Sequence, residues 1–251
     1  MRLVTWNLDG LNDTAVDERT EAAVFTSILG ARLDELHGGV KATPPPDVIV
    51  FQEVVERTYK AHLRQHLRAG GYTVLPDSAP DRQLFEVIAF LDGFRLRAYE
   101  QLPLVDSMFG RVVHVVDLEV TDAPSSTVRV LTAHFDSGTE SGKIRTSQLR
   151  QVAELMASRP SVFAGDANLR KVEWLAVKDE LNLVDVWESV GEPGSSRFTW
   201  QRDEYRARFD RVFVNRGVTP TSMEALGTAV LPGIGTTISD HIGLRVELSI
   251  A

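Results

Sequence analysis

A strand-like apolar run and a polar cluster meet in the stretch Ser161-Val162-Phe163-Ala164-Gly165-Asp166-Ala167-Asn168. The run predicts a short buried strand, and Gly165 lets the backbone turn sharply where that strand ends. Asp166 and Asn168 stand two positions apart and can point the same way into a cleft. The carboxylate could then orient or deprotonate a water, and the amide could donate to a phosphate oxygen. The alternative is an Asx turn at a strand end.

Five more segments repeat this arrangement, in which polar side chains follow a hydrophobic, strand-like run. They are Thr5-Trp6-Asn7, Phe51-Gln52-Glu53, His134-Phe135-Asp136-Ser137, Arg208-Phe209-Asp210-Arg211 and Ser239-Asp240-His241. Any one of them alone is weak evidence. Together the six supply the side chains of a complete metal-dependent site for cutting a phosphate ester.

Length and composition are those of a globular protein. The chain has 251 residues, 43% of them hydrophobic, which is enough to bury a substantial core. It has no cysteine, so disulfides and thiolate metal sites are excluded. We find neither a signal peptide nor an apolar run long enough to cross a membrane. These features predict a soluble, intracellular protein, cytoplasmic or nuclear, with no membrane partner.

The charge of the chain restricts how it could bind nucleic acid. A formal net charge of −8 lacks the overall basic character of non-specific nucleic-acid binders. Positive charge for such a substrate must therefore come from a metal or from a local patch. Candidates for the patch, each of which could equally be a solvated surface charge, are Arg111, Lys143, Arg145, Arg170, Lys171 and Arg208.

Hydrophobic patterning predicts many strands, with helices between the early and middle ones. Expected helices cover residues 17–37, 55–69, 141–158 and 171–181, and Gly38-Gly39 ends the first of them. Expected strands cover residues 1–6, 47–51, 72–76, 84–91, 94–99, 111–120, 127–133, 161–165, 209–214 and 244–250. We therefore expect two packed mixed sheets flanked by helices, an α/β (α+β) sandwich that forms one domain over residues 1–251.

Three carboxylates in the clusters have distinct expected chemistry. Glu53 ends a buried run at the rim of a sheet, where it could bind Mg²⁺ or could be only a solvated or capping residue. Asp210 lies inside an apolar strand, where burial is costly without a partner, and His241 is the obvious partner. Asp210 would fix the tautomer of His241 and favour its protonated form, unless its side chain faces solvent. Asp240 offers a carboxylate on the metal side.

The other histidines and Trp200 are less decisive. His134 ends a strand and could contact a phosphate, whereas we expect His114, in mid-strand, to be structural. We expect His37, His62 and His66 to lie on helix surfaces without a role. Trp200 lies beside a polar loop and could either stack on a base or sugar or pack in the core.

With these residues in view, the chain resembles the endonuclease/exonuclease/phosphatase superfamily over nearly its whole length. Within that superfamily it is most similar to the 5′-tyrosyl-DNA phosphodiesterases, because the Asn-Leu-Arg and Arg-Phe-Asp-Arg pieces go beyond the general pattern. The matching stretches are Thr5–Leu11, Phe51–Val54, Gly165–Arg170, Val184–Glu188, Arg208–Phe213 and Ser239–Leu244.

The resemblance implies a DNase I-like four-layer sandwich, a Mg²⁺ cofactor that Mn²⁺ can replace, and roles for the matching residues. Glu53 would be the main metal ligand, with Asn7 also at the metal and Asp240 supporting it through water. Asp166 would activate the attacking water, while Asn168 and His241, the latter oriented by Asp210, would hold the phosphate. Residues expected to contact the substrate are His134, Arg111, Arg170, Trp200 and Phe209.

The implied substrate is single-stranded or end-frayed DNA that carries a 5′-tyrosyl adduct, cleaved by a monomeric enzyme to leave a 5′-phosphate. The chain departs from the subfamily at His134-Phe135-Asp136-Ser137, where His-Leu-Glu-Ser is usual, and at Gln83-Leu84-Phe85, where Gly-Tyr-Phe is usual. We also expect no amino-terminal ubiquitin-binding domain, since the chain begins at the first strand. A general nuclease, a phosphatase for small or lipid phosphates, and a catalytically dead binding module are the alternatives.

Overall fold

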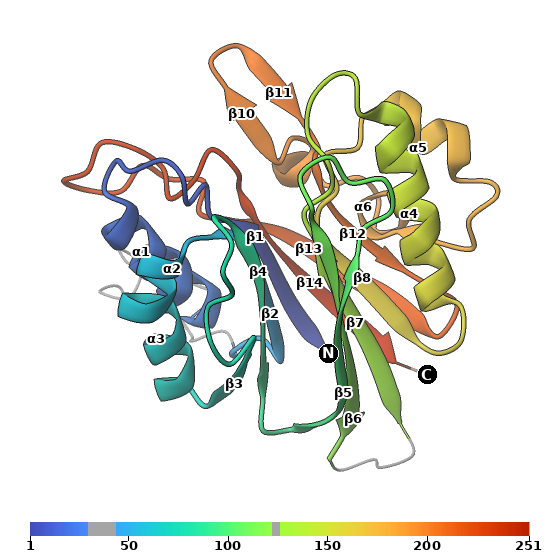
Figure 1. The fold of residues 1–251 in the computed structure, drawn as a ribbon, viewed down its shortest axis with the longest axis horizontal. Coiled ribbons are helices and arrows are strands. Elements are labelled where there is room, and N and C mark those ends of the chain that lie inside the picture. The colour runs from blue at the N-terminus through green and yellow to red at the C-terminus, as the bar shows by residue number, and fades with distance from the viewer. Residues whose placement is uncertain (30–43, 122–125, 251) are drawn as a thin grey trace.

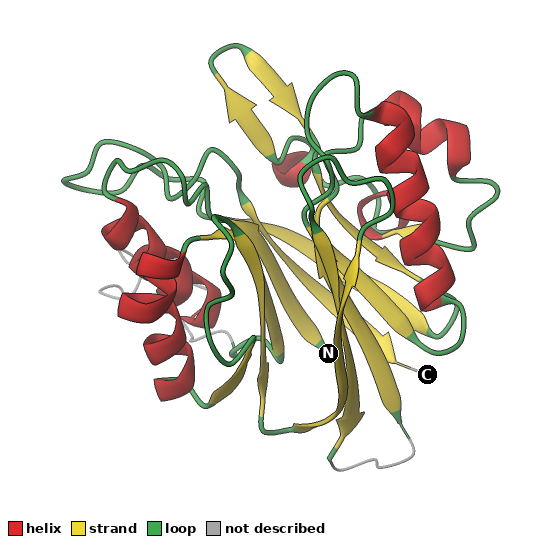
Figure 2. Ribbon diagram, viewed as in Figure 1, coloured by secondary structure: helices red, strands yellow, loops and turns green. Residues whose placement is uncertain are grey.

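Two six-stranded sheets pack face to face, and helices cover the outer face of each (Figures 1 and 2). The computed structural model describes residues 1–29, 44–121 and 126–250. The four layers confirm the expected sandwich of two mixed sheets flanked by helices. The predicted helix end at Gly38-Gly39, the last residues of that helix, and His37 lie outside the described residues.

The first sheet has the strand order β13-β14-β1-β2-β4-β3. Its central strands β1 and β2 are parallel, and β1 pairs with β14 in the antiparallel direction. Its strands are β1 (Arg2–Asn7), β2 (Val48–Val54), β3 (Tyr72–Leu75), β4 (Phe85–Leu91), β13 (Val218–Leu226) and β14 (Gly243–Ile250).

The second sheet has the strand order β5-β6-β7-β8-β12-β9, with β7 and β8 parallel. Its strands are β5 (Phe94–Pro103), β6 (Val112–Val120), β7 (Thr127–Ala133), β8 (Ser161–Asp166), β9 (Val184–Asp185) and β12 (Asp210–Val214). A separate hairpin, β10 (Trp200–Arg202) and β11 (Tyr205–Ala207), projects from the same end of the sandwich as the carboxyl end of β1 (Figure 1).

The helices form the two outer layers. One layer contains α1 (Val16–Leu29) and a continuous helical segment made of α2 (Glu56–Thr58), the π-helical turn η2 (Tyr59–Leu63) and α3 (Arg64–Ala69). The other contains α4 (Gly142–Met156) and α5 (Lys171–Val177). The short elements α6 (Val186–Ser189) and η3 (Gly194–Ser196) follow β9. Among the described residues, no helix has the length and apolarity needed to span a bilayer.

Strand alternation explains how each sheet is buried on both faces. In β2, Val48 and Val50 belong to the core between the sheets, whereas Ile49 and Phe51 belong to the core beneath α1 and the α2–α3 segment. Successive side chains of a strand point to opposite faces, so one apolar run supplies two cores. A third core lies between the second sheet and α4, where Leu149 and Val152 pack on Phe163 and its neighbours.

All the expected strands and helices are present, with ends shifted by a few residues, but one long strand and the short strands β9, β10 and β11 were not predicted. The expected helix over 171–181 ends at Val177. The missed strand β13 lies at the edge of the first sheet, with polar side chains and an irregularity between Pro220 and Ser222. Proline removes a ladder donor and is tolerated at an edge or a bulge, so the sequence lacked the usual strand signal there.

Candidate active site

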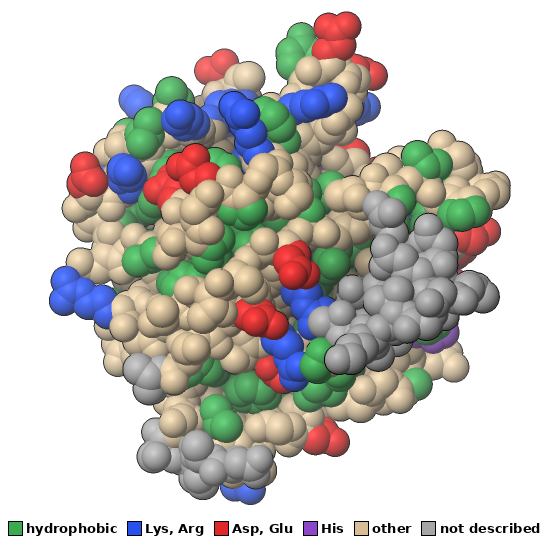
Figure 3. Space-filling view, turned by 180° about the vertical axis from the view of Figure 1, so that it is seen from behind, with side chains coloured by type: hydrophobic (Ala, Val, Ile, Leu, Met, Phe, Trp, Pro, Cys, Tyr) green, Lys and Arg blue, Asp and Glu red, His purple; other side chains and the backbone are tan. Residues whose placement is uncertain are grey.

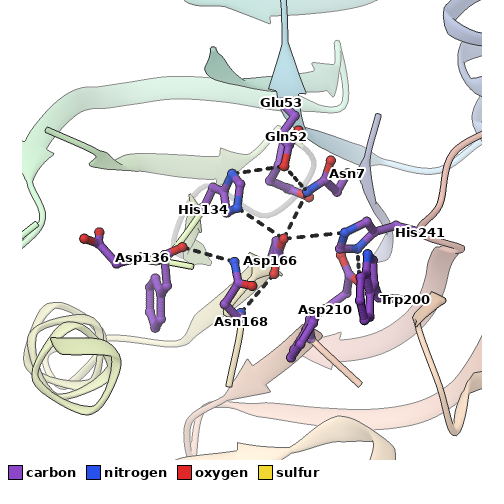
Figure 4. Close-up of polar contacts among 12 residues, drawn as sticks. Asn7, Gln52, Glu53, His134, Asp136, Asp166, Asn168, Trp200, Asp210 and His241 are labelled. Atoms are coloured by element: carbon purple, nitrogen blue, oxygen red, sulfur yellow. Dashed lines mark hydrogen bonds and ion pairs between the residues drawn. The ribbon is translucent and has the colours of Figure 1, made fainter. Parts of the chain in front are cut away.

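The six polar clusters converge at one end of the sandwich, and both sheets contribute to the site (Figure 4). Asn7 ends β1 and Glu53 lies near the end of β2, both in the first sheet. Asp166 ends β8 and Asp210 begins β12 in the second sheet. His241 lies in the loop that leads into β14. Strand ends from two packed sheets therefore form a single constellation of polar side chains.

Three residues at this rim have a left-handed backbone. Asp9, Glu53 and Asn168 have φ values of 49°, 53° and 48°. Such values are unusual for residues with a side chain, cost roughly 1–3 kcal/mol each, and concentrate at functional sites. Gly10 supports this turn, because a Cβ there would lie 2.2 Å from the carbonyl oxygen of Glu53. The rim is shaped to aim these side chains at the cost of local backbone strain.

Asp166 is the hub of the site. Its Oδ1 accepts a hydrogen bond from the backbone N–H of Asn168 at 2.9 Å, and its Oδ2 accepts one from the Asn7 amide at 3.0 Å. The Nε2 atoms of His134 and His241 lie 3.3 and 3.8 Å from that same Oδ2. Burial raises the pKa of Asp166 to about 7, although the nearby His241 opposes the shift. A carboxylate with such a pKa is suited to accept a proton near neutral pH.

Asn7 joins the two principal carboxylates. Its Nδ2 donates to Glu53 Oε1 at 3.0 Å as well as to Asp166, while its Oδ1 accepts from the backbone N–H of Asp9 at 3.0 Å. The amide therefore turns its nitrogen toward the carboxylates and its oxygen away from them. This arrangement makes Asn7 a positioning residue, and its direct contact with a metal stays a prediction.

His241 and Asp210 form the expected pair. His241 Nδ1 lies 2.7 Å from Asp210 Oδ2, and both side chains are buried, so Asp210 does not face solvent. Burial by itself lowers the pKa of His241, but the charge and hydrogen bond of Asp210 outweigh it and raise that pKa to about 10. His241 is therefore an imidazolium at neutral pH, with Nε2–H directed toward the centre of the site.

His134 has the opposite character. It is buried between Glu53 and Asp166, and burial together with the Arg111 charge lowers its pKa well below the ordinary value, so the ring is neutral. Arg111 donates from Nη1 to the carbonyl oxygens of His134, at 3.3 Å, and Phe135. Arg111 thus holds the backbone of this strand end and also brings a cation to the site.

The remaining predicted residues lie around the hub. Asn168 Nδ2 donates to the Phe135 carbonyl at 3.1 Å, so one of its donors is already committed. The indole N–H of Trp200 donates to Asp240 Oδ2 at 2.9 Å. The ring centroids of Trp200 and Phe209 lie 5.2 Å apart. The two aromatic rings and Asp240 therefore form one edge of the site.

Arg170 lies on the opposite side, at the start of α5. Its Nη1 donates to the Gly138 carbonyl at 3.2 Å and lies 3.5 Å from Glu173 Oε1. Its side chain is 36% exposed and lines a neighbouring groove. Among the predicted substrate contacts, Arg170 lies in the groove and not around Asp166.

Sequence reasoning assigned no role to three residues that the structure places at or beneath the site. Burial raises the pKa of Asp9, the nearby Asp240 adds to that rise, and Arg19 and His241 oppose it. Thr199 Oγ1 accepts from the backbone N–H groups of Phe209 and Asp210 at 3.0 and 2.9 Å. Gln52 joins the two sheets from within the core. In β2, Gln52 follows Val48 and Val50 at alternate positions, so it points into the core between the sheets. This alternation is the sequence signal that could have identified it.

The carboxylates of Glu53 and Asp166 fit a divalent cation. Ligand atoms of Glu53, His134 and Asp166 all lie within 4.8 Å of one another. Burial raises the pKa of Glu53 as well as that of Asp166, which means that both anions lack sufficient positive charge nearby. No donor from the described part of the chain pairs with Glu53 Oε2. Carboxylate oxygens are the ligands that Mg²⁺ prefers, so Glu53 is the best anchor for such an ion.

A groove beside the hub combines cations with aromatic rings. It has a volume of about 780 Å³. Its lining includes Arg170, Lys171, Trp187, Arg197, Phe198, Arg206, Arg208 and Phe209. In Figure 3, Lys and Arg side chains gather along the upper margin of the molecule, near the projecting hairpin. A locally basic region therefore exists despite the acidic net charge.

Arg145, predicted as part of the basic patch, is not available to a ligand. Arg145 is fully buried and pairs with Glu173 Oε1 at 2.6 Å, so it presents no charge to a ligand. Arg208 lies at the groove, but its guanidinium stacks 4.1 Å above the Trp187 ring and pairs with Asp185 at 2.8 Å. Packing of α4 against α5 buries Arg145, which periodicity alone could not reveal.

Comparison with known proteins agrees with this geometry. The model of the Endonuclease/Exonuclease/phosphatase family matches residues 4–241. The chain belongs to this family. "Tyrosyl-DNA phosphodiesterase 2" of Xenopus tropicalis is 28% identical over 266 residues, which cover 98% of this chain and 65% of that protein. The chain therefore spans slightly less than two thirds of that relative's length.

Solved structures share the fold over the whole chain. A crystal structure of D. rerio TDP2 humanized by 14 mutations superposes with a TM-score of 0.81 at 25% identity, covering 99% of this chain and 98% of that one. D. rerio TDP2 complexed with a single-strand DNA product gives a TM-score of 0.80 at 24% identity, with the same coverage. The family member described here thus has the complete two-sheet architecture of these proteins.

Proposed function

We propose that this chain is a Mg²⁺-dependent phosphodiesterase that hydrolyses 5′-phosphotyrosyl-DNA bonds and leaves a 5′-phosphate. The observation that carries the proposal is the convergence of Glu53, Asp166 and His241 beside a basic, aromatic-lined groove. The similarity to proteins named tyrosyl-DNA phosphodiesterase 2 supports the choice of substrate.

In the proposed reaction, Asp166 orients a water for in-line attack on phosphorus and takes its proton. Its raised pKa suits it to this task, and the Asn7 amide and Asn168 N–H hold its carboxylate in place. The new bond joins the water oxygen to phosphorus, and the bond from phosphorus to the tyrosine oxygen breaks. A phenol has a pKa of about 10, so the phenolate leaves with little need of a general acid.

The His241 imidazolium would donate from Nε2 to a non-bridging phosphoryl oxygen as negative charge develops there. Asp210 keeps that ring charged and fixes which nitrogen faces the substrate. A Mg²⁺ ion bound by Glu53, for which Mn²⁺ can substitute, would supply further positive charge to the phosphoryl oxygens. Neutral His134 and Arg111 would donate to the same phosphate from the other side.

The DNA strand would follow the basic groove. Phe209 and Trp200 offer ring faces on which a terminal base or sugar can stack, an interaction worth roughly 1–3 kcal/mol for each base. Arg170 and Lys171 would contact the strand's phosphates along the groove. We propose single-stranded or frayed ends as the substrate, a monomeric enzyme, and a nuclear or cytoplasmic location.

The test is cleavage of a single-stranded oligonucleotide that carries a 5′-phosphotyrosine, with and without Mg²⁺. Bis-(p-nitrophenyl) phosphate and a duplex with an abasic site serve as competing substrates. Metal-dependent release of tyrosine with a 5′-phosphate product is expected. Cleavage of only the other substrates would contradict the proposed substrate and favour a general nuclease or phosphodiesterase. A chain with no metal response and no activity would be a binding module instead.

Asp166 is the proposed acceptor of the proton from the attacking water. We expect Asp166→Asn to lower kcat by about 10²–10⁴-fold, because an amide cannot accept the water's proton. Asp179→Asn, an exposed change in the turn after α5, is the matched control and should retain full activity. Circular dichroism should show the same fold for both variants. Activity of Asp166→Asn within a few-fold of wild type would disprove the role of Asp166.

A further inference from the structure

A second cluster of possible metal ligands lies on the helical layer that covers the first sheet. Glu21 belongs to α1, while His62 and His66 belong to the adjoining α2–α3 segment. The two histidines are four positions apart, so they share one face of that segment. In Figure 1, α1 lies beside α2 and α3 in the helical layer outside the first sheet, whereas β8, which ends at Asp166, belongs to the other sheet. From the sequence alone, we expected His62 and His66 to lie on a helix surface without a role.

The three side chains converge on one point. His62 Nδ1 lies 3.0 Å from Glu21 Oε1, and His66 Nε2 lies 3.2 Å from the same oxygen. The two imidazole rings are nearly parallel, with 12° between their planes. Zn–N and Zn–O distances of about 2.0–2.1 Å in a tetrahedral site place neighbouring ligand atoms about 3.3 Å apart. The observed distances of 3.0 and 3.2 Å are close to this ligand-to-ligand distance, so small side-chain shifts would admit an ion.

Asp17 completes the arrangement from one helical turn away on α1. Its Oδ1 lies 3.4 Å from His62 Nε2, the ring nitrogen that does not face Glu21. A carboxylate on the second nitrogen of a histidine ligand fixes the tautomer and the ring orientation, and this partner recurs at metal sites. Arg57 donates to both carboxylate oxygens of Asp17, at 3.0 Å to Oδ2 and 3.4 Å to Oδ1, and holds that carboxylate in place.

We propose that Glu21, His62 and His66 bind a first-row transition-metal dication, for which Zn²⁺ is the probe. Two imidazole nitrogens and one carboxylate suit Zn²⁺ and its neighbours, whereas Mg²⁺ prefers oxygen ligands alone. The side chains of His62, His66 and Glu21 are 23%, 28% and 42% exposed, which leaves an entry path and room for water as a fourth ligand. The ion would tie α1 to the α2–α3 segment. This site is independent of the proposed phosphodiesterase activity.

Titration calorimetry with Zn²⁺ on the full chain in excess Mg²⁺ tests the proposal. Wild-type protein should bind one more tight Zn²⁺ than Glu21→Gln does, and that variant should lose at least tenfold in affinity at this site. Asp17→Asn should weaken the same site about tenfold, as loss of a supporting carboxylate does. Glu154→Gln, an exposed change on α4, is the matched control and should bind as wild type does.

A thermal melt gives a second readout. Zn²⁺ at about 100 times its dissociation constant should raise the Tm of wild type by about 5–10 °C beyond that of Glu21→Gln. Glu53→Gln distinguishes Zn²⁺ binding at the two proposed sites, because it removes a ligand of the catalytic cluster only. If Zn²⁺ binding disappears in Glu53→Gln and persists unchanged in Glu21→Gln, the proposed site does not exist. Unaltered binding in a His62→Gln/His66→Gln double variant would overturn it equally, and if that variant does not fold, Glu21→Gln decides alone.

Discussion

Two histidines of the same site are held in opposite protonation states by their neighbours. Burial and the Arg111 charge keep the pKa of His134 low, so that ring is neutral. His241 is also buried, but the directly bonded carboxylate of Asp210 outweighs the desolvation and keeps that ring charged. A site with one neutral and one charged imidazole can hydrogen-bond and stabilise negative charge at the same time. One carboxylate at 2.7 Å makes the difference.

Asp210→Asn tests this assignment at the residue scale. The variant keeps the shape of the side chain but removes the charge that orients and protonates His241, so we expect kcat to fall about 10²–10⁴-fold with little change in KM. Steady-state kinetics on the 5′-phosphotyrosyl oligonucleotide measures this, with Asp179→Asn as the control. A KM effect without a kcat effect would mean that Asp210 acts in binding alone.

At the scale of elements, Glu173 joins α4 to α5. It accepts hydrogen bonds from the buried Arg145 at 2.9 Å and from the backbone N–H of Arg170, which precedes α5, at 3.0 Å. Arg145 also donates to the carbonyls of Asp136 and Gly138 at 2.9 and 2.7 Å. The pair thus fixes the loop after His134 relative to the start of α5, where the basic groove begins.

Glu173→Gln should lower the free energy of unfolding by about 2–3 kcal/mol, because a buried guanidinium loses its counter-charge. Burial raises the pKa of Glu173, but the hydrogen bonds from Arg145 outweigh it and lower that pKa below the ordinary 4.5. The stabilisation is therefore present above about pH 4.5 and is lost as the pH falls through the lower native pKa. Urea unfolding from pH 7 down to pH 3 measures the difference in free energy of unfolding between wild type and Glu173→Gln. This difference should become smaller below about pH 4.5. A difference in free energy of unfolding that does not change with pH, or one that the control Glu154→Gln also shows, would contradict this account.

For the molecule as a whole, the alignment of the two sheets governs the site. Gln52 in β2 donates from Nε2 to Thr132 Oγ1 of β7 at 2.9 Å and to Thr5 Oγ1 of β1 at 3.2 Å, within the core between the sheets. At the site itself, Asn7 of β1 and Asp166 of β8, both buried, make a second bridge. Because each sheet holds half of the constellation, these bridges set the distance between the two halves.

Gln52→Leu should weaken both stability and catalysis. It keeps the volume but leaves two buried threonine hydroxyls without a partner, so we expect a loss of about 1–3 kcal/mol in the free energy of unfolding. A small displacement of Glu53 relative to Asp166 should also lower kcat by about tenfold or more. Denaturant unfolding and kinetics measure these effects, and Gln65→Leu, exposed on α3, is the control. Wild-type activity in a destabilised variant would show that the bridge supports the fold only.

The sequence by itself determined ten of the strands, the helices to within a few residues at their described ends, the layered class and the order of the polar clusters. It could do so because alternation and strand-end chemistry are local. It also paired His241 with Asp210, because a charge inside an apolar strand needs a partner. It did not predict the edge strand β13, because Pro220 and the polar residues there lack the usual strand pattern. Only the tertiary structure decided the burial of Arg145 and the meeting of Glu21 with His62 and His66. Such contacts depend on how separate layers pack, and no local period encodes the distance between side chains that are far apart in the chain.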